Sequence, residues 1–180
     1  MKILQLLEQK EKLISEIDWV AKILDDNGNM PESYDYLNLS GYKITSLKGV
    51  SKHVKTYCDV ASNELTDLEY VPEYIGTYLQ IKENKITSLA NIHTKIKHVK
   101  RIECIGNPIK SNVLGLLKIS GLENVYMFDE GKHIYGISYP EINEKLKTVE
   151  EIVNRHLPNG DIMECQDELL DAGLSEYAKL

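Results

Sequence analysis

Hydrophobic residues recur along the middle of this chain with a period of 21 residues, starting at Tyr36, Tyr57 and Tyr78. The three copies read YLNLSGYKITSLKGV, YCDVASNELTDLEYV and YLQIKENKITSLANI. The columns that are apolar in every copy are Leu37/Cys58/Leu79, Leu39/Val60/Ile81, Ile44/Leu65/Ile86, Leu47/Leu68/Leu89, Val50/Val71/Ile92 and Val54/Ile75/Ile96. A fixed period of this kind predicts stacked repeats, each of which buries its apolar face only against its neighbours.

Each copy opens with alternating apolar and polar residues, a pattern that predicts a short strand with one face inward. In the first copy the inward residues are Leu37 and Leu39. Asn63 and Asn84 follow the next two strands at the same position, where a side-chain amide can satisfy backbone groups left unpaired by a sharp turn. Tyr42 stands at that position in the first copy.

The repeat continues more loosely towards the C-terminus. RIECIGNPI begins at Arg101, 23 residues after Tyr78, and has Asn107 at the asparagine position, so we place a two-residue insertion near 97–100. NVYMF follows another 23 residues later and predicts a fifth strand over 124–128. Residues 111–120 predict a short helix that ends at Gly121.

The pattern L-x-L-x-x-N-x-L resembles the leucine-rich repeat in its short form. The resemblance implies an α/β fold, a short leucine-rich-repeat solenoid with a parallel sheet of about four to five strands. The tail LPNGDIMECQDELLDAGLSEYAKL resembles tails of small leucine-rich-repeat proteins encoded by tailed bacteriophages. This second resemblance implies a phage protein that binds and inhibits a bacterial host or anti-phage defence protein.

The chain divides into residues 1–30, 34–128 and 129–180, because the open ends of a solenoid need caps. We expect 1–30 to be an N-terminal helical cap, since its apolar residues lie on one helical stripe. In the C-terminal helical segment, Thr148 with Glu151 predicts a helix to about His156. Asp161 with Glu164 predicts a second helix that ends at Gly173. HIYGISYP, over 133–140, is interpreted as one more strand or a hairpin.

Residues between the inward columns should point out of the concave face of the solenoid. Adjacent strands lie roughly 4.8 Å apart, so Tyr36, Tyr57 and Tyr78 should stack in a row with Arg101 at its end. The predicted binding residues on this face are Tyr36, Asn38, Tyr57, Asp59, Tyr78, Gln80, Lys82, Arg101 and Glu103. Tyrosine and arginine are enriched in interface hot spots, which favours protein binding. Cross-strand aromatic pairs also stabilise a sheet by roughly 0.2–1 kcal/mol each, so a purely structural role stays open.

Composition narrows the classes of partner and compartment. Acidic residues number 28 and basic residues 21 among 180, which argues against binding nucleic acid through bulk charge. Three cysteines without short spacings predict neither a disulfide framework nor a zinc site and favour a cytoplasmic location. No apolar run reaches the roughly 18 residues that a membrane span needs, and the N-terminus lacks the pattern of a signal peptide. The chain has 11 tyrosines, and a single column of the repeat accounts for three of them.

The sequence shows no arrangement typical of catalysis, and we expect no enzyme activity, cofactor or metal. The histidines form no metal-binding pair, and motifs for hydrolase or phosphate chemistry are absent from the sequence. Asp59 and Glu103 flank Gln80 but should lie roughly 9–10 Å apart, too far to share a proton. Two alternatives remain: self-assembly to a homodimer through the N-terminal helix, and a small-ligand or enzyme pocket near the C-terminal segment gathering His133, His156 or Asp161.

Overall fold

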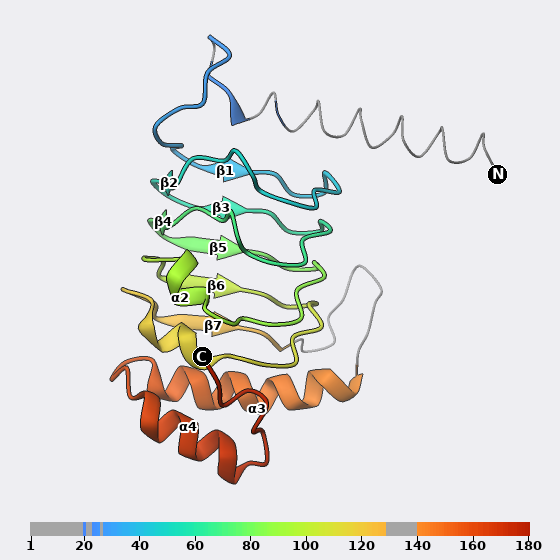
Figure 1. Ribbon diagram of the computed structural model, residues 1–180, viewed down its shortest axis with the longest axis vertical. Helices are drawn as coiled ribbons and strands as arrows, with labels where there is room; N and C mark the ends of the chain where they lie inside the picture. The colour runs from blue at the N-terminus through green and yellow to red at the C-terminus, as the bar shows by residue number, and fades with distance from the viewer. Residues whose placement is uncertain (1–19, 21–22, 26, 129–139) are drawn as a thin grey trace, which may run out of the picture.

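The protein is a solenoid of stacked chain turns, and one strand from each turn joins a five-stranded parallel sheet. The computed structural model describes residues 20, 23–25, 27–128 and 140–180. The sheet runs in the order β1 (Leu37–Asn38), β3 (Cys58–Asp59), β5 (Tyr78–Gln80), β6 (Arg101–Glu103) and β7 (Asn124–Tyr126), as Figure 1 shows. The predicted solenoid with a parallel sheet is therefore confirmed, including the fifth strand.

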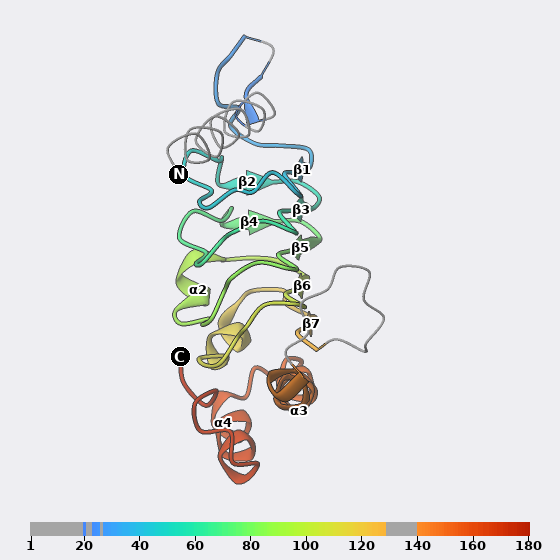
Figure 2. The same ribbon diagram turned by 90° about the vertical axis from the view of Figure 1, so that its right-hand side faces the viewer.

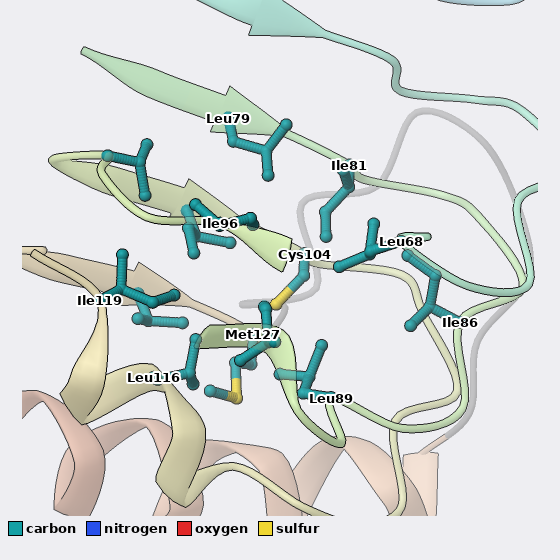
Figure 3. Close-up of a cluster of buried hydrophobic side chains, with 14 of the residues drawn as sticks. Leu68, Leu79, Ile81, Ile86, Leu89, Ile96, Cys104, Leu116, Ile119 and Met127 are labelled. Atoms are coloured by element: carbon teal, nitrogen blue, oxygen red, sulfur yellow. The ribbon is translucent and has the colours of Figure 1, made fainter. Parts of the chain in front are cut away.

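The strands pair in the register that the repeat predicts. Leu37 lies opposite Cys58, Cys58 opposite Leu79, and Leu79 opposite Ile102. These residues and the next inward column are buried, together with apolar residues of the connecting segments. Figure 3 shows how Leu79 and Ile81 on one turn meet Cys104 and Met127 on later turns, so that the core is continuous along the solenoid.

A second side of each turn carries short strands that also pair in parallel. β2 (His53–Val54) pairs with β4 (Tyr74–Ile75), and single bridges extend this ladder to His98 and Ser120. On the side away from the sheet, the connections include α2 (Ile92–Lys95) and a 3-10 helix, Leu114–Lys118, as the turned view in Figure 2 shows for α2. The predicted helix over 111–120 is thus shorter than expected and ends before Gly121.

One predicted column needs correction. Tyr74 bridges to His98, so Val99, which follows His98 and is buried, takes the place that Ile75 has in the previous turn. Ile96 is buried as well, but it belongs to the end of the α2 turn. His98 follows Tyr74 by 24 residues, three more than the period, whereas Arg101 follows Tyr78 by 23. Three residues are therefore inserted before His98, where the chain forms α2, and one is missing between His98 and Arg101, instead of two being inserted near 97–100.

Buried asparagines close the turns after the strands. The side-chain oxygen of Asn84 accepts from the N–H of Leu65 at 2.9 Å, and its amide donates to the carbonyls of Val60 and Ile81 at 3.0 and 3.1 Å. Asn63 and Asn107 make equivalent bonds one turn before and one turn after. The expected role of this column is confirmed. The residue before each asparagine has a positive φ: 53° at Ser62, 52° at Glu83 and 76° at Gly106.

The C-terminal helices lie at the β7 end of the sheet. α3 (Pro140–His156) crosses next to β7, and α4 (Ile162–Asp171) packs against α3 (Figure 1). The prediction that Thr148 begins a helix is wrong, because Thr148 lies inside α3. Proline suits the first turn of a helix, so Pro140 is the better start signal. The start of α4 is confirmed: Asp161 accepts from the N–H of Glu164 at 3.0 Å.

Two predictions fall on parts of the chain outside the description. The N-terminal helical cap over 1–30 depends mainly on residues 1–19, and the strand or hairpin over 133–140 on residues before Pro140. Of the helices described, none is both long enough and apolar enough to cross a membrane.

Candidate protein-binding surface

The exposed face of the five-stranded sheet carries a stacked aromatic row. Tyr36 and Tyr57 have ring centroids 5.5 Å apart with an 18° angle between their planes, and Tyr57 and Tyr78 are 5.1 Å apart at 5°. The guanidinium carbon of Arg101 lies 4.8 Å from the centre of the Tyr78 ring. The strand register thus brings together the four residues that the sequence predicts, and we call them the tyrosine row.

The tyrosine row lies on a rigid support. Each of its residues is next to a buried inward residue, and the main chain beneath it is held by bonds between successive turns, such as Leu37 N–H to Tyr57 carbonyl at 3.0 Å. Tyr36 is 60% exposed at one end of the row. Partial burial beside Tyr57 raises the pKa of the Tyr78 hydroxyl, which therefore stays protonated at neutral pH and can donate a hydrogen bond.

A second row runs beside the first and is partly occupied by local structure. It contains Asn38, Asp59, Gln80 and Glu103, as predicted. The side chain of Asn38 accepts from the N–H of Ser40 at 3.1 Å, and that of Asp59 from the N–H of Ala61 at 3.0 Å. These two side chains therefore stabilise the turn that follows their own strand, a role that does not require a ligand.

Charged side chains gather at the β6 end of this face. Glu103 lies between Lys82, whose Nζ is 2.5 Å from one carboxylate oxygen, and Arg101, whose Nε is 3.0 Å from the other. The contact with Arg101 is an ion pair without hydrogen-bond geometry. Glu103 is the most buried of the three, so the two cations present their charge outward while Arg101 keeps its place over Tyr78.

The structure adds residues that the sequence prediction did not include. Asn124 lies opposite Arg101 and the exposed Tyr126 opposite Glu103, so β7 extends both rows. On the β2–β4 side, the rings of His53 and Tyr74 stack at 4.7 Å. The 21-residue spacing between those two positions was the available signal for this second stack.

The cysteines and the metal-ligating residue types of the described ranges show no assembled site. Cys58, Cys104 and Cys165 are buried, and burial raises the pKa of each thiol, that of Cys165 to about 11. No group of three His, Cys, Asp or Glu side chains in the described ranges is placed to hold a metal ion. His156 contacts Glu168 at 2.8 Å and Asp161 opens α4, while His133 lies outside the description.

Comparisons with known proteins leave the family open. No protein-family model, no curated protein and no solved structure matches the chain.

Proposed function

We propose that this protein is a binding module of the leucine-rich-repeat type and that the tyrosine row is the centre of its contact with a partner protein. The observation that carries this proposal is the stack of the exposed Tyr36 on the half-buried Tyr57 and Tyr78, continued by Arg101. Tyrosine and arginine supply large contact areas, and both are typical of interface hot spots. Because the rings are already ordered by stacking, binding would cost little additional side-chain entropy.

The rim of the surface supports a protein partner as well. Asp59, Gln80, Lys82 and Glu103 lie along one side of the rings and Arg101 at one end, so both charge signs and an amide group border the stack. An apolar or aromatic centre with a polar rim is the usual organisation of a protein interface. The resemblance of the tail to phage-encoded repeat proteins favours a bacterial host protein as the partner, with inhibition as the outcome of binding.

We also infer that α3 acts as the C-terminal cap of the solenoid. Two of its side chains bond to the main chain of β7 and of the residues that follow it. Asn154 bonds to the N–H and carbonyl of Val125, each at 2.8 Å, and Glu150 accepts from the N–H groups of Met127 and Phe128. These bonds take the place of a further strand. The corresponding N-terminal cap and the self-assembly through residues 1–24 stay predictions from the sequence.

Substitution of the tyrosine row tests the binding proposal. The variant combines Tyr36→Ser, Tyr57→Ser and Tyr78→Ser, and the matched control combines Tyr70→Ser with Tyr74→Ser, two exposed tyrosines away from the sheet face. Each tagged protein is used to capture partners from a bacterial lysate, after circular dichroism and melting have verified its fold. We expect the row variant to lose at least nine-tenths of the captured partner and the control to retain it.

The result that would contradict the proposal is equally direct. If the row variant folds and still captures every partner at the level of the unmodified protein, the tyrosine row is not the binding surface. A loss of capture by the control variant would instead place the contact on the β2–β4 side.

A further inference from the structure

The first strand of the sheet has one edge without a partner strand among the described residues. In β1 and its flanks, the N–H groups of Leu37 and Leu39 donate to the carbonyls of Tyr57 and Asp59 on β3 and its flank, at 3.0 and 2.7 Å. Alternate residues of a strand direct their main-chain groups to opposite sides. The N–H and C=O groups of Tyr36 and Asn38 therefore point away from β3, and no strand of the described chain lies there.

Later turns indicate which kind of group fits this edge. The carbonyls of Asp59, Gln80 and Glu103 each accept an N–H from the preceding turn, at 2.7, 2.9 and 2.8 Å. Asn38 stands at the same position of β1, and it is exposed whereas its counterparts are half-buried. A strand laid parallel to β1 would make the bonds that every later pair in the sheet already makes.

The side chain of Tyr36 offers a second contact at this edge. One face of its ring packs on Tyr57. At the other end of the row, Arg101 lies over the ring of Tyr78. The high exposure of Tyr36 leaves its outer face free to receive a ring or a guanidinium. The β7 end differs, because Asn154 and Glu150 already bond to its edge.

We propose that the edge of β1 that no described strand occupies binds an extended segment of a partner protein, which joins the sheet as a parallel strand and places an aromatic or arginine side chain on Tyr36. Main-chain bonds supply affinity in this mode and alternate side chains supply specificity. A second copy of the chain fits less well, since two β1 strands related by a two-fold axis pair antiparallel and would not continue the ladder. The inference goes beyond the proposed function because it assigns a role to main-chain groups at an edge, and Tyr36 is the one residue that it shares with the tyrosine row.

A synthetic peptide provides the probe. The peptide TYLQIKE copies residues 77–83, which form β5 and its flanks, and is titrated against the full chain by fluorescence polarisation. Methyl groups on the nitrogens that correspond to Leu79 and Ile81 remove the donors that would face β1. The control peptide carries its methyl group on the nitrogen that corresponds to Gln80, which would face away. We expect the first modification to weaken binding at least tenfold and the second to change it less than threefold.

Substitutions on the protein side give an independent measurement. Asn38→Pro removes the N–H on the free edge, while Leu37 and Leu39 keep their bonds to β3. Asn38→Ala loses the same side-chain bonds to Ser40 but keeps the N–H, so it is the matched control. We expect a loss of at least tenfold in peptide affinity for Asn38→Pro only. If Asn38→Pro does not fold, the two methylated peptides decide the question on the unmodified chain.

Three outcomes would overturn the proposal. One is a peptide that fails to bind the full chain at millimolar concentration. Another is equal affinity for the two methylated peptides. The third is a dimer of the chain that Asn38→Pro converts to monomer without any peptide, which would assign the edge to a second copy. Loss of edge binding leaves Tyr57, Tyr78 and Arg101 intact, so this test and the test of the tyrosine row can fail separately.

Discussion

Single buried asparagines determine how the turns of this protein close. Asn84 is buried and satisfies one N–H and three carbonyls. Replacing it with an apolar residue leaves those groups buried and unpaired, at a cost of about 1–3 kcal/mol for each group that finds no new partner.

We predict that Asn84→Ala lowers the free energy of unfolding by about 3 kcal/mol, whereas Asn124→Ala, an exposed asparagine on β7, lowers it by less than about 0.5 kcal/mol. Denaturant unfolding followed by circular dichroism measures both values. Equal effects of the two substitutions would show that the turn does not depend on the amide.

His93 should make the stability of the folded protein decrease in mild acid. Its Nδ1 is buried without a hydrogen-bond partner next to Gly115, and burial together with Lys118 and Lys97 lowers its pKa from the ordinary 6.5. The unfolded chain then binds the proton more readily than the folded chain, so stability decreases as the pH falls through and below about 6.5.

We expect His93→Gln to reduce the loss of stability between pH 7.5 and 5.5 relative to the unmodified chain. Urea titrations at the two pH values provide the comparison. A further loss is expected at lower pH from Glu73, whose pKa is lowered from 4.5 by its hydrogen bond to Lys52. An identical pH profile for His93→Gln and the parent would contradict the assignment.

At the scale of elements, the edge of β7 is held by two side chains rather than by a strand. The amide of Asn154 both donates to and accepts from Val125, so an aspartate there would set a carboxylate against a carbonyl. Glu150 accepts from two N–H groups at 2.6 and 2.7 Å, and bonds of this charge-assisted kind contribute about 1.5–3 kcal/mol.

We predict that Asn154→Asp and Glu150→Ala each lower stability by about 2 kcal/mol and expose the amides of Val125 and Met127 to hydrogen exchange. Glu151→Ala, an exposed neighbour on the same helix, is the control and should leave both amides protected. Unchanged protection of Val125 in the Asn154→Asp variant would argue against a capping role for α3.

The sequence predicts the sheet better than it predicts these contacts, for a physical reason. Strand register follows from columns such as Leu37/Cys58/Leu79, because the buried side of every turn requires an apolar residue at the same position. The stacked tyrosines follow from the same register. Asn154 has no such repetition, and nothing in one sequence relates it to Val125, 29 positions away. Thr148 with Glu151 matches the capping motif of a helix start, but both residues lie inside the longer helix that begins at Pro140.

At the scale of the whole molecule, the stability of each turn should depend mainly on the turns next to it. Each strand pairs only with its neighbours in the sheet, so no strand pairing among the described residues joins the first turn to the last. In such arrays, a defect weakens its own turn and the adjacent one most strongly.

We predict that Leu37→Ala, which removes a side chain that is 2% exposed, costs about 2–5 kcal/mol locally and reduces amide protection in β1 and β3. The amides of β6 and β7 should keep their protection. Hydrogen exchange measured residue by residue tests this gradient, and a uniform loss across all strands would indicate that the solenoid unfolds as one unit.

The rates at which the three buried thiols react can report how often their surroundings open. A thiol reacts with an alkylating reagent as its thiolate, and burial suppresses that form, so each cysteine must wait for its surroundings to open. Cys58 reports on the second strand of the sheet, Cys104 on the fourth turn and Cys165 on α4. Mass spectrometry of timed alkylation would therefore compare the opening rates of two turns of the solenoid and of α4 in a protein without introduced cysteines. We expect Cys165 to react first.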